Sequence, residues 1–359
     1  MPISGSIITG PNLGFVDCGI DDSAGAGGGS GQVGTQARRE VVISGKRVKT
    51  VDVHAHCIVP EAAKLIDHSL EAPGLLWSNI SDRLAQMDRS GVDVQALSIN
   101  PYWYRAERDA VAELIRVQNE ALAEFCASDQ DRFVAFATAA LQYPDLASEQ
   151  VEQAVKTFGF RGIGVGGSVA GEDLANPKFH PFWAKCEELG VLVFMHPLGT
   201  RELEPSGRLA GNGLLTNTIG NPLETTIALS HLIFEGTLDR FPGLKICASH
   251  GGGFLPSYAN RSDAVITTFP DRVGPLPKKK PTEYIRGGQL YFDSIMFTDE
   301  GMRHLIAEAG IDHVVLGTDY PFPWNTAPVD HVMSIPGLSD EDRIKILSGT
   351  AAKLLGIEG

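Results

Sequence analysis

Five residues of the types that bind metal ions follow short apolar segments of this chain. His54 and His56 stand in VDVHAHC, His196 in FMHP, His250 in SHGGG and Asp319 in GTDYP. Residues two apart on a strand point to the same side, so His54 and His56 can converge on one ion. Imidazole nitrogens and a carboxylate, with one position left open, make up a catalytic zinc site. The pattern predicts such a site if the fold brings these residues together.

Each of these residues is weak evidence alone, because a single histidine at a strand end is more often structural than a ligand. The combination of H-x-H with three later strand ends that carry His, His and Asp makes coincidence a poor explanation. The remaining histidines lie in predicted helices or at strand starts, and we interpret them as structural: His68, His180, His231, His304 and His313.

The elements that must position the site form a regular alternation from residue 48 onward. Apolar, β-branched segments alternate with helical ones such as Arg108–Ala127, whose apolar residues recur at spacings of three and four. This alternation is typical of βα units around a parallel sheet. The predicted strands are Val48–His54, Val92–Ile99, Phe133–Ala139, Gly162–Gly166, Val191–His196, Leu244–Ser249, Leu290–Ser294 and His313–Thr318.

Eight strands with intervening helices predict a (β/α)8 TIM barrel. A doubly wound open sheet is the rival, but no G-x-G-x-x-G follows the first strand. In a closed barrel, strands one, five, six and eight bring their carboxyl ends to a common mouth, which is where the five residues stand. We expect residues 47–359 to form one catalytic domain and the Gly-rich residues 1–46 an extension, either a loose tail or an arm on a neighbouring subunit.

Composition excludes several classes of protein. The chain has 359 residues and a formal net charge of −14, so it lacks the basic surface of a nucleic-acid-binding protein. It has no apolar segment of about 18 residues, and we expect no membrane span. Its five widely spaced cysteines fit neither a disulfide framework nor a cysteine zinc site, which favours a cytoplasmic location.

Longer motifs around these residues resemble the amidohydrolase superfamily. They are VDVHAHC, FMHP, SHGGG, GTDYPFPW, RLAQMDRSGVDVQALS, NPLETTIAL, FPGLKICASHGGGFLP and ILSGTAAKLLGI. They are most similar to the branch of aminocarboxymuconate-semialdehyde decarboxylase and related aromatic-acid decarboxylases, from about Val51 to Ile357.

The resemblance implies His54, His56, His196 and Asp319 as ligands of one divalent ion, with His250 close to the metal-bound water or substrate as acid/base. In a decarboxylation His250 or Asp319 is placed to manage the proton, so both are our catalytic candidates. Zinc is the first choice and manganese an alternative, because ligand type alone discriminates poorly between them. Binuclear relatives carry a carboxylated lysine after strand four. Here that strand reads GIGVGG, which favours a mononuclear site.

An acidic substrate needs cationic partners, and arginine clamps a carboxylate through two parallel hydrogen bonds. Arg201 and Arg208 lie in the long segment after strand five. Arg261 matches an arginine that in the decarboxylase reaches the site of a neighbouring subunit. Three aromatic residues near strand ends are candidates for walling a planar ring, with rim packing as the alternative: Trp103, Phe297 and Trp324.

The sequence also departs from the decarboxylase. An insertion after H-x-H that supplies basic residues is missing here, and the tryptophan that follows HP is Leu198. The resemblance therefore specifies the chemistry better than the substrate.

We expect a metal-dependent, non-oxidative decarboxylase acting on an aromatic or ring-cleavage-derived unsaturated carboxylic acid, a small-molecule carboxylate. The first alternative is a metal-dependent hydrolase or hydratase acting on a lactone, amide or unsaturated diacid. The second is a non-catalytic barrel, which the presence of every ligand disfavours. Relatives are usually dimers or larger, so we expect a homodimer or higher homo-oligomer.

Overall fold

The computed structural model describes residues 38–70, 72–76, 80–200, 203, 206–324 and 327–358. Eight parallel strands form one sheet in the order β12-β11-β10-β9-β6-β5-β4-β3. Their sequences are buried apolar runs, as expected where both faces of a parallel sheet are covered. The strands are β3 (Val51–His56), β4 (Val94–Ser98), β5 (Phe133–Ala137), β6 (Gly162–Val165), β9 (Leu192–Met195), β10 (Lys245–Ala248), β11 (Leu290–Asp293) and β12 (Val314–Val315).

The segment after β12 joins the first and last strands of this order. The Asp319 N–H donates to the His54 carbonyl (2.8 Å), and the His56 N–H donates to the Tyr320 carbonyl (2.7 Å). These bonds close the sheet on itself, so the predicted (β/α)8 barrel is confirmed. They also bring the carboxyl end of β3 directly beside Asp319.

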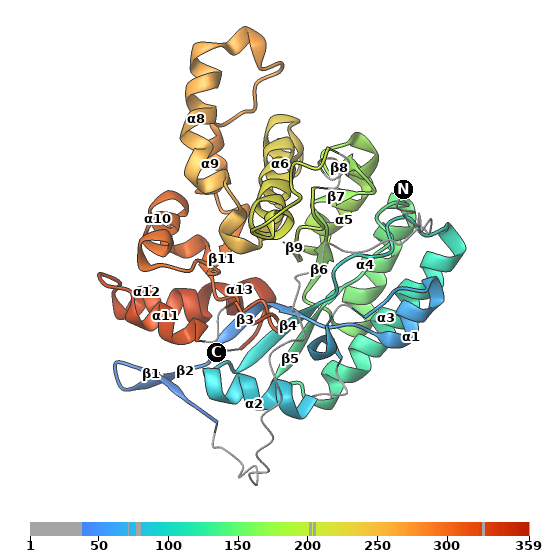
Figure 1. The fold of residues 1–359 in the computed structure, drawn as a ribbon, viewed down its shortest axis with the longest axis vertical. Helices are drawn as coiled ribbons and strands as arrows, with labels where there is room; N and C mark the ends of the chain where they lie inside the picture. Colours follow the sequence, from blue (N-terminus) through green and yellow to red (C-terminus); the bar gives the residue numbers. More distant parts are fainter. Residues whose placement is uncertain are drawn as a thin grey trace, which may run out of the picture.

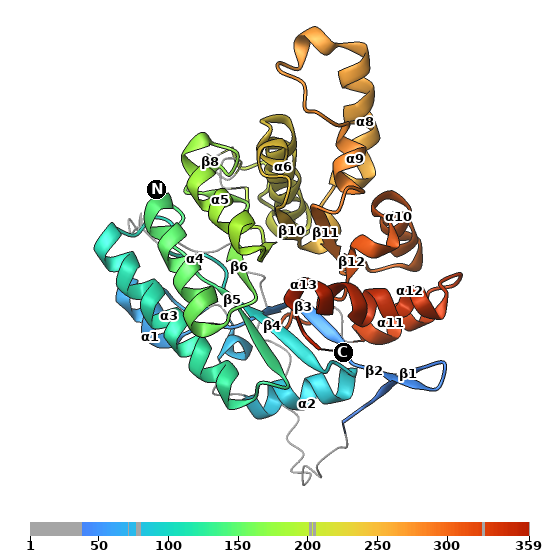
Figure 2. The ribbon, with the colours of Figure 1, turned by 180° about the vertical axis from the view of Figure 1, so that it is seen from behind.

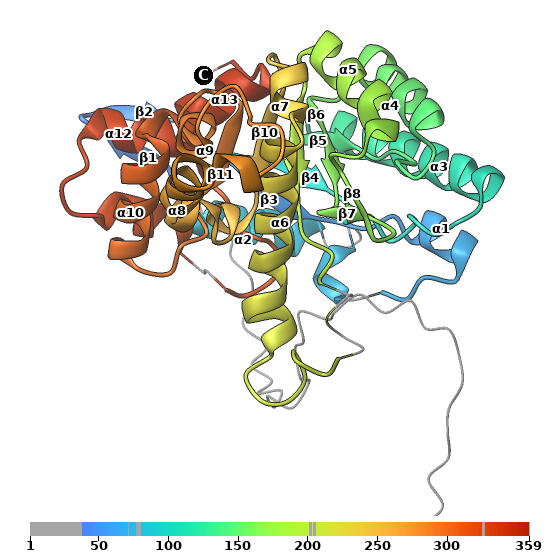
Figure 3. The ribbon, with the colours of Figure 1, turned by 90° about the horizontal axis from the view of Figure 1, so that it is seen from above.

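Helices surround the strands on the outside (Figures 1 and 2). Helices α8 and α9 project beyond the rest of the molecule, and the residues leading into α6 extend past one face (Figure 3). None of the helices in the described ranges combines the length and apolar character that a membrane crossing requires. The helices are α1 (Pro60–Ala63), α2 (Ile80–Ser90), α3 (Arg108–Ser128), α4 (Pro144–Phe158), α5 (His180–Leu189), α6 (Asn221–Phe234), α7 (Thr237–Arg240), α8 (Leu255–Thr268), α9 (Pro281–Ile285), α10 (Asp299–Ala309), α11 (Pro328–Ser334), α12 (Asp340–Ile344) and α13 (Thr350–Leu355).

The first barrel strand begins three residues later than the sequence predicts, at Val51 rather than Val48. The preceding residues form an antiparallel hairpin of β1 (Val41–Ile43) and β2 (Lys46–Val48). Its two turn residues, Ser44 and Gly45, both have positive φ (49° and 75°), the backbone conformation of a tight hairpin turn. Another short hairpin, β7 (Ser168–Val169) with β8 (Glu172–Asp173), follows β6.

Candidate metal and substrate site

The predicted ligands lie at the carboxyl ends of three strands. His54 and His56 belong to β3, His196 follows β9 by one residue, and Asp319 lies four residues after β12. All four side chains are buried, and one ligand atom from each lies within 4.8 Å of the others. The barrel therefore gathers residues 54, 56, 196 and 319 into one cluster.

The ligand atoms point at one another. The Nε2 atoms of His54 and His56 are 2.9 Å apart, and Asp319 Oδ1 lies 3.1 Å from the first and 3.0 Å from the second. Buried polar atoms normally need a partner, and if both Nε2 atoms are unprotonated they face each other only lone pair to lone pair. A cation shared by these atoms satisfies all of them, so the donor set fits a divalent ion.

A second group holds each of the three imidazoles at Nδ1. These partners are the Asp293 carboxylate for His54 (2.6 Å), the Ser98 hydroxyl for His56 (3.1 Å) and the Pro197 carbonyl for His196 (2.9 Å). A carboxylate or carbonyl partner fixes the proton on Nδ1 and leaves Nε2 free for a metal. At His54 and His196 the tautomer is thus the one that a metal site requires.

Opposite charges counteract burial in this cluster. Burial lowers the pKa of His54, but the charge of Asp319 and the hydrogen bond with Asp293 outweigh it and raise that pKa to about 10, so without an ion His54 carries a proton on Nε2 that a bound cation would replace. Burial opposes ionisation of Asp319, but the positive charge of His54 and a hydrogen bond from His250 outweigh it and hold the pKa of Asp319 well below its usual range. Burial likewise lowers the pKa of His56, to about 4, so this imidazole is neutral at pH 7. An ionised carboxylate and a neutral imidazole are the forms that bind a metal.

His250 lies immediately beside the ligands. Its Nε2 is 3.5 Å from Asp319 Oδ2, so one carboxylate faces the ligand histidines with one oxygen and His250 with the other. Its backbone has a positive φ of 53°, and its N–H donates to Asp293 Oδ2 (2.9 Å). His250 is partly exposed, unlike the four ligand residues. This position suits a group that exchanges protons with a substrate.

Asp293 is a site residue that the sequence reasoning missed. It is the last residue of β11, fully buried, and contacts both His54 and the backbone of His250. Its place at the carboxyl end of the seventh strand, level with the other site residues, is the signal that could have revealed it.

A cavity of about 260 Å³ opens next to His250 and Asp319. Phe297 and Trp324 form aromatic parts of its wall, and residues at the start of α6 form another part. Among its described lining residues only His250 and Asp319 are ionisable. The lining residues are Asn217, Thr218, Asn221, Pro222, His250, Ile295, Phe297, Asp319 and Trp324.

The aromatic candidates separate into two groups. Phe297 and Trp324 line this cavity and are 67% and 37% exposed, so their rings are available to a ligand. Trp103 is fully buried in the hydrophobic core, where its indole N–H donates to the Ala139 carbonyl (2.9 Å). The structure therefore brings two of the three candidates to the cavity and leaves Trp103 in the core, because its indole packs inward rather than at the barrel mouth.

The arginine candidates do not line the cavity of their own chain in the described residues. Arg208 is exposed in the loop before α6, and Arg261 is exposed on the projecting helix α8. Arg201 lies outside the described residues.

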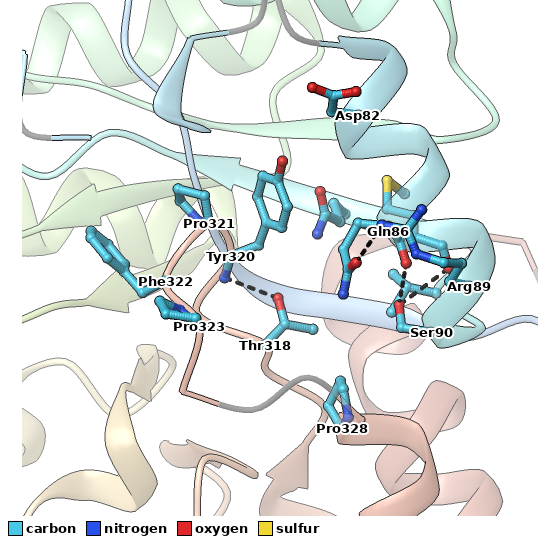
Figure 4. Close-up of a pocket in the computed structure, with 13 residues that line it drawn as sticks. Asp82, Gln86, Arg89, Ser90, Thr318, Tyr320, Pro321, Phe322, Pro323 and Pro328 are labelled. Atoms are coloured by element: carbon cyan, nitrogen blue, oxygen red, sulfur yellow. Dashed lines mark hydrogen bonds between the residues drawn. The ribbon is translucent and has the colours of Figure 1, made fainter. Parts of the chain in front are cut away.

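A second cavity, of about 310 Å³, lies between α2 and the segment after β12 (Figure 4). Thr318 and Tyr320 line it, whereas Asp319 between them lines the cavity beside His250. None of the four ligand residues lines this second cavity, which separates it from the candidate site.

The amidohydrolase family model matches residues 51–357 of the chain. A 2-amino-3-carboxymuconate-6-semialdehyde decarboxylase of Dictyostelium discoideum is 30% identical over 86% of this chain and 85% of that protein. A γ-resorcylate decarboxylase of Rhizobium sp. (strain MTP-10005) is also 30% identical, over 86% and 98%.

A solved structure is also similar to this chain over most of its length. A dihydroxybenzoic acid decarboxylase of Polaromonas sp. JS666, with bound manganese and the inhibitor 2-nitroresorcinol, matches with a TM-score of 0.73 and 27% identity. The match covers 86% of this chain and 97% of that one. With its barrel, its His/His/His/Asp cluster and a family match over almost all of the described residues, the chain belongs to the amidohydrolase family.

Proposed function

We propose that this protein is a metal-dependent, non-oxidative decarboxylase of an aromatic or ring-cleavage-derived unsaturated carboxylic acid. The observation that carries the proposal is the cluster of His54, His56, His196 and Asp319 beside a cavity with aromatic walls. Relatives named as decarboxylases, at 30% identity over most of their length, support this reaction over hydrolysis.

The cluster would hold the ion, which when bound supplies positive charge that attracts and orients the substrate carboxylate. Phe297 and Trp324 would lie against the planar part of the substrate and exclude water from it. Loss of CO₂ breaks the bond between the carboxylate and its carbon, and the electron pair of that bond passes into the conjugated system. A proton must then reach the same carbon.

His250 and Asp319 are the groups that we assign to this proton. Imidazole transfers protons efficiently near neutral pH, and general acid catalysis contributes about 10²- to 10⁴-fold to a rate. Asp319 Oδ2, 3.5 Å from His250 Nε2, would stabilise the protonated imidazole before transfer. Protonated His250 would donate its proton to the substrate carbon and so become neutral, and solvent would then return a proton to the imidazole.

We propose one ion, with zinc as the first choice from the ligand set and manganese as the alternative. The manganese in the Polaromonas structure supports the alternative. Elemental analysis of protein purified without chelators, followed by reactivation of the metal-free protein with each ion, distinguishes them.

The remaining parts of the proposal concern the assembly. Arg261 is exposed on a helix that projects from the barrel, which supports a role in a neighbouring subunit's site within a homodimer or larger homo-oligomer. We further propose that residues 47–359 form the catalytic domain, that residues 1–46 form an extension of it, and that the protein acts in the cytoplasm.

The test is CO₂ release by the metal-loaded protein from 2,6-dihydroxybenzoate, other hydroxybenzoates and an aminocarboxymuconate semialdehyde. We expect CO₂ from at least one of them and none after the metal is removed. A lactone, an amide and an unsaturated diacid are assayed in parallel. Turnover of one of these without CO₂ release from any acid would favour the hydrolase or hydratase instead.

A further inference from the structure

The cavity beside His250 contains a polar side chain that has no hydrogen bond with the described residues. Asn221 is the first residue of α6 and is 7% exposed. Its side-chain amide makes no hydrogen bond with any residue in the described ranges, although it lines the cavity together with His250 and Asp319. The amide is open to the cavity, so a ligand group that reaches it can pair with it without breaking a hydrogen bond inside the protein.

The other polar residues of this wall differ from Asn221. Thr218 is exposed, and its hydroxyl already donates to the carbonyls of Gly213 and Leu214 (3.2 and 3.3 Å). Asn217, one turn before Asn221, is half-buried and has an interaction of its own. Among the described uncharged polar residues of this wall, Asn221 is thus the one whose side chain is mostly buried and still available to a ligand.

The helix around Asn221 is held in place independently of any ligand. Glu224, three residues later, is buried and accepts the backbone N–H groups of Leu198 (2.5 Å) and Gly199 (2.6 Å). These two residues follow His196 in the chain, so α6 is tied to the segment that leaves the metal cluster. The backbone at Asn221 is therefore held close to the segment that carries His196.

We propose that Asn221 determines specificity by hydrogen-bonding an uncharged polar substituent, such as a ring hydroxyl, on the acid bound at the metal. This inference rests on the proposed function. An amide offers both a donor and an acceptor and carries no charge, so it pairs with a hydroxyl in either direction. A site built to bond a hydroxyl discriminates strongly against the analogue that lacks it, because the buried group then stays unpaired.

The test compares ligands that differ in this substituent. Binding of 2,6-dihydroxybenzoate, 2-hydroxybenzoate and benzoate to the metal-loaded protein is measured by calorimetry for wild type and Asn221→Leu. Leucine keeps the approximate shape of asparagine and removes its hydrogen bonds. Gln153→Leu, at an exposed position on α4, is the matched control for an amide-to-leucine change.

We expect Asn221→Leu to bind the best hydroxylated acid about tenfold to a hundredfold more weakly. Benzoate affinity and metal content should stay within about twofold of wild type, and Gln153→Leu should match wild type throughout. Equal losses for benzoate and the hydroxylated acids would overturn the inference. So would unchanged affinity for the hydroxylated acids, or a wild type that binds them no better than benzoate.

The inference and the proposed function fail in different ways. If hydroxylated acids bind through Asn221 but no acid loses CO₂, the decarboxylase assignment fails and the binding role stands. If CO₂ is released equally well by wild type and Asn221→Leu from every acid, the decarboxylase stands and the role of Asn221 fails.

Discussion

The Asp293 carboxylate lies 2.6 Å from Nδ1 of His54, although the two residues are 239 positions apart in the sequence. Asp293 also accepts the backbone N–H groups of His250 (2.9 Å), Gly251 (2.9 Å) and Ile295 (3.2 Å). Each of its oxygens thus faces two donors. One side chain fixes the imidazole of a proposed metal ligand and the backbone of the proposed proton donor.

Asp293→Asn should weaken metal binding about 10- to 100-fold while the barrel stays folded. An amide has one acceptor and one donor end, so either orientation sets an NH₂ group against N–H donors. If the NH₂ group of the asparagine faces His54, it donates to Nδ1. That bond favours the tautomer in which Nε2 is protonated and cannot bind a metal. Competition with a chromophoric chelator measures the affinity, and Asp271→Asn, at an exposed position, is the control. Wild-type affinity in Asp293→Asn would contradict the role given to this carboxylate.

His250→Asn should reduce CO₂ release at least about a hundredfold without loss of the metal, because it removes the proposed proton donor and leaves the proposed ligands in place. Steady-state kinetics and elemental analysis of the same sample check both parts. His231→Gln, on the outer part of α6 and 39% exposed, should be as active as wild type. Full activity of metal-loaded His250→Asn would remove this residue from the mechanism.

Mixing two inactive variants tests whether Arg261 acts in a neighbouring site. In a dimer of one His250→Asn chain and one Arg261→Met chain, one site has both wild-type residues if Arg261 acts across the interface. Random exchange of subunits should then restore about a quarter of wild-type activity. If Arg261 acts within its own chain, every mixed site lacks one residue and no activity returns. If the Arg261→Met variant alone is fully active, this arginine has no role in the reaction.

Arg83→Met should lower the free energy of unfolding of the metal-free protein by about 1–3 kcal/mol. Arg83 is 1% exposed, donates to the Gln95 side chain (3.1 Å) and to the His56 carbonyl, and stacks on the Tyr320 ring at 4.3 Å. Methionine fills similar space but leaves both acceptors unpaired. Urea denaturation measures the change. Arg89→Met, exposed on the same helix, should change stability by less than about 0.5 kcal/mol.

The barrel and its ligand cluster could be predicted because both depend on local sequence. Buried parallel strands appear as short apolar runs, and residues that follow such runs meet at one barrel mouth. Side chains two residues apart on a strand point to the same side, so the H-x-H spacing in β3 was enough to predict that both histidines face the same way. The hairpin β1–β2 shifted the start of that strand without moving His54 or His56.

Contacts between distant segments could not be predicted in this way. In the sequence, Asp293 is only a polar residue near the end of a predicted strand. The contact with His54 becomes apparent only in the folded structure. Trp103 and Trp324 both lie in loops, and only packing decides that the first is buried and the second lines the cavity. Asn221 follows a long segment rich in Gly and Thr, where sequence periodicity gives no side-chain direction.

Apart from Asp319, which belongs to both, the cavity wall and the ligand cluster come from different parts of the chain. Four of the nine lining residues, from Asn217 to Pro222, belong to one short segment at the start of α6, whereas three of the four ligands belong to or follow β3 and β9. If this cavity binds the substrate, substitutions in that segment can change which acid is accepted while the proposed ligands stay in place. Because four of the nine described lining residues fall within these six positions, a small combinatorial library over residues 217–222 varies nearly half of the described cavity wall.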